Sequence, residues 1–541
     1  MIHHMLTRDA NDESAEMTVN TRTAADALHN STKHGTGPAQ PDRLVRYRRL
    51  DPDNAPDSFK RYRDLPIWPL PRTLVSSNPP AVSVLSGNRG DTAPFDSSLL
   101  GTLLHLAAGI TRTTVAPGCR PTFFRAAMSA GNLQPIEVYI VAGPAIDGIA
   151  AGVHHFAPYE FGLTLLRRGD YRPALSVTAP VALILTGVAW RTTWKYGERG
   201  WRHLYWDAGT MLANLVAAAD AHGLDTEVLA GFDDAAVSRL IGVDGVDEAP
   251  VAVVALGSGS DVGQPPRVNL EQLSYDVDPV APHPVRLPLF VEAQMGSALN
   301  QGDVGRWRQA ANQVSSAAPA RTTPPQEASS EPIEAVILRR GSTRAMRHDS
   351  IATDAFRWSL AAATRAVPLD AAPRGTLLEH FINIHAVDNV RPGAYRWEGG
   401  DLHLIAATVS PRDAGALLCL NQPLGGNSAY TAFHHAHLNP ILDALGSRGY
   451  RAAQLEAGIV SGRLALCAFA IGLGATGLTF FDDPVTDYFH TTSSPMLATA
   501  VGVSQTPPAP SGTPGDPVTL KRYDEPMTQV SINLQRSCPA G

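Results

Sequence analysis

The chain of 541 residues has a formal net charge of −7, with 44 % hydrophobic and 18 % charged residues. These are globular values, and the length suits two domains of about 200–250 residues better than one. The acidic balance gives no support for a nucleic-acid partner, and four scattered cysteines without a CxxC pair argue against disulfides or structural zinc and favour the reducing cytoplasm.

Residues 1–69 are expected to form a polar N-terminal extension. The opening sequence MIHHMLTRDANDESAEM is polar and acidic, so we predict no signal peptide. The pattern allows one short helix near Ala24–Leu28, and the rest of the first 60 residues is expected to be poorly ordered.

Residues 70–262 alternate between helical and strand patterns. Apolar residues three and four positions apart predict helices at Ser97–Ala108 and Tyr205–Ala221. Apolar runs predict strands at Glu137–Ala142, Pro180–Thr186 and Pro250–Leu256. Mixed helices and strands of this kind indicate an α+β domain.

Residues 263–330 are expected to connect this domain to a second one at 331–504. The stretch SSAAPARTTPPQEASSEP predicts a flexible linker, and residues 505–541 begin with a Pro/Gly-rich run that predicts a loose tail. The elements predicted for the second domain are a helix around 354–364, a strand at Phe381–Val387, a turn at Gly393–Trp397, a strand at Leu402–Ala407, a long helix at 450–472 and a strand at Gly477–Phe481.

The chain contains one segment twice. Residues 197–234 and 446–483 align at a constant offset of 249, and 15 of 38 positions are identical, where composition alone predicts about three or four. One α+β fold has therefore been duplicated and fused. The two copies are expected to pack about a pseudo-twofold axis, as the subunits of a homodimer would, so that the fused chain can act as a monomer.

The apolar stretch Leu464–Phe481 is long enough to raise the question of a membrane span. Its copy in the first repeat carries Asp220, Asp225 and Glu227. A buried helix that runs into a strand explains both copies, so we predict no membrane association.

The segment Arg340–Arg344 has two arginines around Ser342. Guanidinium groups form bidentate, charge-assisted bonds to phosphate, so this pattern suits a phosphate clamp. The competing interpretation is a solvated basic turn.

A second candidate site precedes the strand predicted at 137–142. Small residues let the backbone approach a planar ligand, and Ser and Asn side chains can hydrogen-bond ring heteroatoms. The competing interpretation is an ordinary polar loop. The residues of this loop are Ser129, Ala130, Gly131, Asn132, Gln134 and Pro135.

Lys195 and Tyr196 stand just ahead of the long helix of the first repeat. A lysine whose pKa is lowered by burial can act as an acid or base, and a tyrosine can donate or orient a proton. The competing interpretation is a lysine at the surface beside a packed tyrosine.

Two further patterns are set aside. Gly472–Gly477 matches GxGxxG, but it ends a helix and leads into a strand, the reverse of a dinucleotide-binding turn. His434, His435 and His437 have no Cys or carboxylate cluster at metal-ligand spacing, so we predict no metal site.

Taken together, the motifs resemble the flavin-dependent nitroreductase superfamily. Its R-x-S-x-R clamp is matched by Arg340, Ser342 and Arg344. Its P-S-x-x-N-x-Q-P loop is matched from 128 to 135, except that Met128 replaces the first proline. A long helix followed by a hydrophobic strand end and two aspartates, here Leu478–Asp483, is also a family feature.

The first repeat is most similar to the SagB-type dehydrogenases, which oxidise azolines in ribosomal peptides. This resemblance implies that Lys195 and Tyr196 are catalytic. It also implies an azoline-like peptide or small-molecule substrate. The matching segments are Ser129–Asn132, the P-x-E-x-Y run that ends at Tyr139, Gly152–Phe156, Lys195–Tyr196, Arg199–Arg202 and Asp207–Gly209.

In homodimers of this family each FMN site takes its clamp and strand end from one subunit and its loop from the other. Here the second repeat keeps the clamp, where the first has Ser86–Arg89. The first repeat keeps the loop, where the second has Val367–Ala372, and Lys195–Tyr196 correspond to Ala444–Leu445. The resemblance therefore implies one intact FMN site across the interface and one degenerate site.

The residues implied to hold FMN come from both repeats. Backbone N–H groups near the strand end are implied to face the flavin N5 atom. The implied residues are Arg340, Ser342, Arg344, Ser129, Ala130, Gly131, Asn132, Gln134, Leu478, Thr479 and Phe480.

Two alternatives stay open. One is a nitro- or quinone-reductase, which would bind NAD(P)H transiently over the flavin and needs no separate nicotinamide motif. The other is a flavin-free scaffold subunit of a peptide-modifying complex, which the replacement at Met128 and the loss of the second site leave open.

Overall fold

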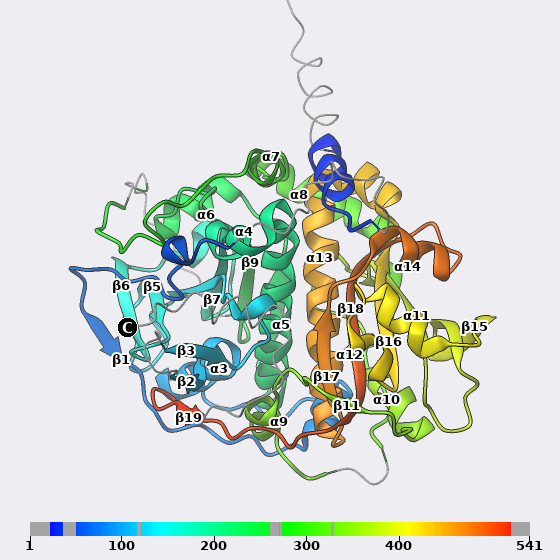
Figure 1. Cartoon of the computed structure of the whole chain (residues 1–541). Helices are drawn as coiled ribbons and strands as arrows, with labels where there is room; N and C mark the ends of the chain where they lie inside the picture. The colour runs from blue at the N-terminus through cyan, green and yellow to red at the C-terminus, as the bar shows by residue number, and fades with distance from the viewer. Residues whose placement is uncertain are drawn as a thin grey trace, which may run out of the picture.

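The computed structural model describes residues 22–35, 50–115, 121–259, 270, 273–325 and 329–520. Within them the chain forms two α+β halves that lie side by side, each built on an antiparallel sheet (Figure 1). The α+β class is confirmed. Predictions for residues 1–21, 36–49 and 521–541, and for Cys119 and Cys538, lie outside the described residues, whereas Cys419 and Cys467 are free and buried.

The sheet of the first half (residues 70–262, with the edge strand β1 just before it) has the order β1-β6-β5-β4-β7-β9-β8. Three of its strands were predicted from apolar runs, and the structure confirms them. The strands are β1 (Ile67–Pro69), β4 (Ile136–Ala142), β5 (Gly152–Ala157), β6 (Gly162–Arg168), β7 (Val181–Val188), β8 (Thr226–Leu229) and β9 (Glu248–Leu256).

The sheet of the second half (residues 331–504) has the order β11-β18-β16-β13-β14-β15, with β17 also paired to β18. Its connectivity repeats that of the first sheet, because the strand order β15-β14-β13-β16-β18-β17 corresponds to β6-β5-β4-β7-β9-β8. The strands are β11 (Met346–Arg347), β13 (Leu378–Ile384), β14 (Gly393–Glu398), β15 (Asp401–Ala407), β16 (Tyr430–Ala436), β17 (Gly474–Leu478) and β18 (Ser494–Ser504).

The turn predicted at Gly393–Trp397 is wrong, because these residues belong to strand β14. Its Arg396 pairs with Phe381 of β13. Pro392 and Gly393 suggested a turn, but the alternating buried side chains that follow them suit a strand between two neighbours. The strand predicted at Gly477–Phe481 also lies earlier, as β17.

The helices α5 (Gly200–Ala221) and α13 (Leu438–Ala470) pack against each other at the centre of the molecule (Figure 1). At their crossing, Gly209 faces Gly458, which is its copy at the offset of 249. A Cβ atom on Gly209 would lie 2.6 Å from the Cα of Gly458. The close approach of the two backbones therefore requires glycine on both helices.

The helix predicted at 450–472 begins earlier, at Leu438, and bends at Gly446, where φ is +58°. In the first half Gly197, with φ of +57°, separates α4 (Ala189–Tyr196) from the turn that leads into α5. Both glycines adopt the left-handed region that other residues avoid. The bend therefore lies at the same place in both copies, and α4 corresponds to the start of α13.

Other helices cover the sheets and the ends of the central pair. Those predicted at Ser97–Ala108 and around 354–364 are confirmed as α3 and α10. In chain order the helices are α2 (Ala81–Leu85), α3 (Ser97–Ala108), α6 (Asp234–Ile241), α7 (Pro288–Gly296), α8 (Gln301–Val314), α9 (Ile333–Arg339), α10 (Thr353–Ala363), α11 (Pro411–Leu418), α12 (Pro423–Asn427) and α14 (Asp482–Tyr488). Among the described helices, none has an apolar stretch of the length that a bilayer crossing needs.

The connector between the halves is more ordered than its composition predicts. Helices α7 and α8 lie within it, and Trp307 of α8 is buried in the core, with its Nε1 donating to the carbonyl of Leu445 at 3.1 Å. The predicted flexible linker is also pinned, because β10 (Ser316–Ala317) pairs with β12 (Gly375–Thr376). Pairing with a distant strand was not visible in its sequence.

Both ends of the described chain pack on the halves. The helix expected near Ala24–Leu28 spans 22–31, and the amide of Ala25 donates to Ser447 Oγ at 3.1 Å. The tail predicted to be loose instead forms β19 (Val518–Leu520), which pairs with β2 (Ile110–Thr114), itself paired with β3 (Thr122–Arg125). Tertiary pairing outweighs the Pro/Gly composition here.

Candidate functional site

The predicted loop before β4 is anchored to α5 by a carboxylate. Asp207 accepts a hydrogen bond from Ser129 Oγ at 2.6 Å and another from the amide of Ala130 at 2.9 Å. Gly131, Asn132 and Gln134 have φ values of +63°, +57° and +51°. A loop that holds two non-glycine residues in the left-handed region stores strain, and such strain is concentrated at functional sites.

The polar side chains of this loop mainly brace the loop itself. Asn132 Nδ2 donates to the carbonyl of Phe123 at 2.8 Å, and Gln134 Nε2 donates to Asn132 Oδ1 at 2.7 Å. The amide of Gln134 donates to Ser129 Oγ at 2.9 Å. The outer surface that the loop can offer a planar ligand is therefore its backbone and the small residues Ala130 and Gly131.

Lys195 and Tyr196, at the end of α4, reach this loop. A Cβ atom on Gly131 would lie 2.5 Å from Tyr196 Oη and 2.9 Å from Lys195 Nζ. Both functional groups therefore stand against a position where any side chain would displace them. The Tyr196 ring is stacked on His203 of α5, with ring centroids 4.0 Å apart and planes 15° from parallel.

The two side chains are shifted toward opposite protonation states. Burial lowers the pKa of Lys195, and the charge of Arg344 lowers it further. Burial and the nearby Asp207 raise the pKa of Tyr196, against the opposing charge of Arg344. Lys195 is therefore the easier of the two to obtain as a neutral base, while Tyr196 stays a protonated donor.

Arg340, in the predicted clamp, is buried at the boundary of the two halves. Its Nη2 donates to the carbonyl of Ala126 in the first half, and its Nε has no partner among the described residues. Burial, together with the charge of Arg112, lowers its pKa to about 9, and no carboxylate offsets this shift. A buried cation without a counter-ion is a site for an anion.

The rest of the clamp runs from this buried arginine to the exposed Arg344. The amide of Thr343 donates to the carbonyl of Ala475 at 3.0 Å, which lays the clamp backbone along β17. Ser342 is half-buried between them. The charge of Arg344 acts on Lys195 and Tyr196, so the exposed end of the candidate clamp lies near these two side chains.

The strand end after β17 has unused donors on its backbone. The side chains of Leu478 and Phe480 are buried in the core. Within the described residues, the amides of Thr479 and Phe480 donate to no group, and the buried Thr479 Oγ1 has no partner. Uncompensated donors of this kind are costly unless a ligand accepts from them.

The strand end is locked to α5 by a buried ion-pair network. Asp482, which follows it, accepts from Arg199 at 2.9 Å and from Arg202 at 2.7 Å. In the equivalent network of the first half, Asp234, after β8, accepts from Arg448 and Arg451 of α13. Each central helix thus holds the strand end of the other half.

The counterpart strand end in the first half is closed by the chain itself. The amides of Ala230 and Gly231, which are the copies of Thr479 and Phe480, donate to the carboxylate of Asp370 at 2.7 and 3.1 Å. The amide of Val228 donates to the carbonyl of Pro368 at 2.7 Å. The donors that stay free in one half are therefore satisfied by the protein in the other.

The sequence comparison placed Val367–Ala372 of the second half at the position of the Ser129–Pro135 loop, and the structure corrects this. Glu456, the copy of Asp207, accepts from Thr376 Oγ1 and from the amide of Leu377 at 2.9 Å. The segment that meets the helix carboxylate in the second half is therefore 376–377, whereas Val367–Ala372 provides the closure of β8. The reason is that the loop before β13 is shorter and takes a different path.

Sequence reasoning missed three residues of this site. Asp207 was matched only as part of a family run, yet it anchors the loop, and burial raises its pKa to about 7. Its copy Glu456, also a carboxylate, was the available signal. Arg112 donates to the carbonyls of Leu338 and Arg340, and His203 stacks on Tyr196; neither had a sequence signal.

The histidine pattern set aside above is internal to the second sheet. His380 and His434 lie with their Nδ1 atoms 3.1 Å apart in the buried interior. Among the described residues, no group of three His, Cys, Asp or Glu side chains is placed to hold a metal ion.

The fold defines a class of protein, a pair of similar α+β halves packed through their central helices. Residues 91–258 match the nitroreductase family, so the chain contains a nitroreductase-family domain. A crystal structure of an Anabaena variabilis protein assigned to the nitroreductases covers 89 % of this chain and 99 % of its own, at 23 % identity and a TM-score of 0.68. The two-half fold is therefore a known one.

Two curated relatives are named for processing trifolitoxin and microcin B17. The trifolitoxin-processing protein TfxB of Rhizobium leguminosarum is 30 % identical over 205 residues, which is 35 % of this chain and 54 % of TfxB. The microcin B17-processing protein McbC of Escherichia coli is 29 % identical over 146 residues, 25 % of this chain and 54 % of McbC. The chain spans about half the length of either.

The residues present fit FMN as a ligand. Arg340 offers a buried positive charge that lacks a counter-ion. The amides of Thr479 and Phe480 offer donors without a partner in the described residues, and the loop has no side chain at Gly131, where Lys195 and Tyr196 approach it. An anionic phosphate joined to a planar ring with acceptor nitrogens matches these groups.

Proposed function

We propose that the chain is an FMN-dependent oxidoreductase that oxidises an azoline-like ring in a peptide. The observation that carries this proposal is the position of Lys195 and Tyr196 against Gly131 of the loop. In the proposed complex, these two groups would face the ring of a substrate that lies on the flavin. The peptide-processing relatives support a peptide as the substrate.

The residues that would hold the cofactor come from both halves. Arg340, Ser342 and Arg344 would bind the phosphate side, with Ser129–Gln134 and the backbone of Leu478–Phe480 along the ring. Bound FMN would supply the acceptor for the two electrons that leave the substrate. Holding the groups in place beforehand is the contribution of the protein.

Lys195 would take the proton that an azoline loses on oxidation. Its burial and the neighbouring Arg344 lower its pKa, which favours the neutral amine that a base requires. Tyr196 would stay protonated and donate to the substrate through Oη, since its pKa is raised. His203 keeps the Tyr196 ring oriented by stacking on it.

The test uses FMN-reconstituted protein and a synthetic peptide that contains one thiazoline. We expect the peptide to lose two hydrogens, as measured by mass spectrometry, and the double variant Lys195→Ala/Tyr196→Ala to bind FMN but to lose turnover. Ala444→Ser, at the matched position in the second half, serves as the control. Full turnover in the double variant would remove the assigned roles.

The nitroreductase-like fold supports a second candidate, reduction of nitro or quinone compounds by NAD(P)H. Steady-state oxidation of NAD(P)H with a nitroaromatic compound, without thiazoline turnover, would favour it. A protein that stays colourless after reconstitution with FMN would instead favour the scaffold alternative.

A further inference from the structure

In the second half, strand β11 fills a groove at the edge of the sheet. Met346 and Arg347 of β11 pair with Ser504 and Val503 of β18. Met346 is buried, and its Sδ would lie 3.2 Å from a Cβ atom on Gly502. The groove therefore accepts a short extended segment with an apolar side chain pointing inward and a charged one, Arg347, pointing outward.

Among the described residues of the first half, no strand corresponds to β11. Leu229 of β8 pairs with Val253 of β9, and its copy Leu478 of β17 pairs with Ala498 of β18. Val253 and Ala498 are therefore equivalent, and counting on from them makes Ser258 and Gly259 equivalent to Val503 and Ser504. In the described part of the chain, no strand pairs with Ser258 or Gly259. The reason lies upstream, where the amide of Gly90 donates to the carbonyl of Asp220 and leads the chain away.

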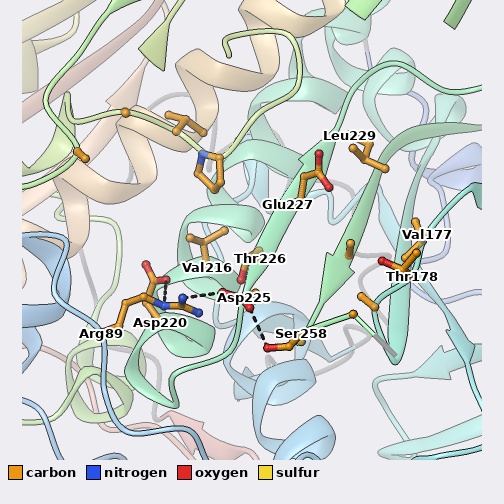
Figure 2. A pocket seen from close by; sticks show the side chains of 18 of the residues that line it. Arg89, Val177, Thr178, Val216, Asp220, Asp225, Thr226, Glu227, Leu229 and Ser258 are labelled. Atoms are coloured by element: carbon orange, nitrogen blue, oxygen red, sulfur yellow. Dashed lines mark hydrogen bonds and ion pairs between the residues drawn. The ribbon is translucent and has the colours of Figure 1, made fainter. Parts of the chain in front are cut away.

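The position left open is a pocket of about 510 Å³ (Figure 2). Leu229 and Ala255 line it at the copies of Leu478 and Ala500, which pack with Met346 in the second half. Residues 176–179 line the opposite side. The strands β7 and β16 begin at equivalent positions, 249 residues apart, so residues 176–179 correspond to 425–428. Residues 425–428 lie at the end of α12, beside β11. The pocket is thus the vacant place of a β11-like strand.

Most charges of the pocket lining have a partner, since Arg365 lies 3.6 Å from Asp220 and Arg308 pairs with Asp370 next to the pocket. Arg89 meets Asp225 at 2.7 Å and Asp220 at 3.6 Å, and Ser258 Oγ donates to Asp225 at 2.9 Å (Figure 2). The pocket therefore does not select an ion. The buried Thr226 Oγ1 has no partner in the described chain, and Glu227 has no ion pair there. These groups suit a peptide backbone with a basic residue on its outer face.

We propose that this groove binds an extended segment of the peptide substrate, as a short strand added along Ser258–Gly259. An aliphatic side chain of the segment would lie over Leu229 and Ala255. The edge of β8 already shows this capacity, because residues 368–370 of the chain pair with Val228. That the peptide is the substrate rests on the proposed function; the groove itself does not.

The first experiment uses a fluorescent hexapeptide with the sequence of residues 344–349, Arg-Ala-Met-Arg-His-Asp. We expect saturable binding below about 1 mM by anisotropy, and at least tenfold weaker binding of the same peptide with Asp in place of Met. Ser258→Pro, which removes an edge amide at an exposed residue, should weaken binding by a similar factor. Arg340→Ala should leave binding unchanged.

The proposed groove would be overturned if the hexapeptide showed no saturable binding. It would also be overturned if neither Ser258→Pro nor the replacement of Met by Asp in the peptide changed the affinity. Binding that emerges only when residues 521–541 are removed would identify the tail of the chain as the occupant and would also overturn it. Unchanged flavin content in Ser258→Pro verifies that this variant is folded.

The second experiment separates this inference from the proposed function. With a long thiazoline peptide, Ser258→Pro should raise KM at least about tenfold and leave kcat unchanged, while a thiazoline dipeptide is unaffected. An unchanged KM would overturn the substrate role of the groove. Failure of the wild-type protein to oxidise either peptide, with hexapeptide binding intact, would count against the proposed function alone.

Discussion

At the scale of single residues, the candidate site contains buried ionisable groups whose pKa values are shifted by burial. Arg340 is a buried cation without a carboxylate, and Lys195 is a lysine whose pKa burial lowers. Asp207 is a carboxyl whose pKa burial raises to about 7. Burying each of these groups is costly by itself, which agrees with the roles proposed for Arg340 and Lys195 and with the loop-anchoring contact of Asp207.

Arg340→Ala should weaken FMN binding by about 1.5–3 kcal/mol, roughly 10- to 150-fold in Kd, because a charged hydrogen-bond partner of the phosphate is lost. Riboflavin, which lacks the phosphate, should bind the variant and the wild type equally. Fluorescence titration measures both ligands. Arg347→Ala, which removes an exposed arginine paired with Asp349, is the control. Equal weakening of both flavins would contradict a phosphate contact.

Asp207→Asn and Glu456→Gln form a matched pair at equivalent positions of the two central helices. Burial raises the pKa of each carboxyl to about 7 in the folded chain. Folding therefore takes up a proton between the ordinary pKa and about pH 7, so each carboxyl adds stability as the pH falls through this window. The slope is at most about 1.4 kcal/mol per pH unit, and it is absent above pH 7.

The free energy of unfolding of the wild type should therefore rise when the pH falls from 7 to 5. In each variant this rise should be smaller by about 1–2 kcal/mol. Urea unfolding at the two pH values measures this difference. Asp207→Asn alone should also lower kcat, because it alone anchors the loop that touches Lys195 and Tyr196. Equal activity of the two variants would remove the link between Asp207 and the catalytic pair.

At the scale of elements, the same strand-to-helix connection serves as a ligand site in one half and as a closed structure in the other. Free amides follow β17, whereas those after β8 donate to Asp370. The central helices keep both strand ends in place through arginine pairs. The function of an element therefore depends on which distant segment covers it.

Asp370→Ala should destabilise the protein by about 1–3 kcal/mol, because two buried amides and Arg308 lose their acceptor. Denaturant unfolding measures the change. Asp349→Ala, at an exposed ion pair, should stay within about 0.5 kcal/mol of wild type. A neutral effect of Asp370→Ala would show that its hydrogen bonds are replaced by water.

Gly209→Val and Gly458→Val should each destabilise the protein by at least about 2 kcal/mol, because a side chain would force α5 and α13 apart. FMN affinity should fall with stability, since the site is built from both halves. Gly305→Ala, on an exposed face of α8 with open space around it, should be neutral or stabilising by up to about 1 kcal/mol. Tolerance of valine at both positions would contradict the tight crossing.

At the scale of the whole molecule, the two halves together carry one set of the residues proposed to bind FMN. We predict one FMN per chain, released and counted by absorbance near 450 nm, the ordinary band of the oxidised cofactor. A particle of one chain should be seen by light scattering, because the central helix interface is already internal. Two FMN per chain would contradict the closure of the counterpart site by Asp370.

The sequence by itself showed two similar segments and predicted much of the local structure. A constant offset of 249 and regular apolar spacing are properties of the chain order, so they predicted the repeat, α3, β4, β7 and β9. The resemblance to the nitroreductases also implied that the clamp and the loop lie on different repeats. The predicted helices and strands depend on neighbours a few residues apart, and the repeat is visible by comparing the sequence with itself.

Only the tertiary structure decided which groups meet. The anchoring of Ser129 by Asp207, the closure of β8 by Asp370 and the open groove beside Ser258 join residues far apart in the chain. The strand at Gly393–Glu398 and the ordered connector likewise depend on pairing with distant partners. Burial and hydrogen-bond satisfaction are properties of the packed molecule, so no local pattern could predict them.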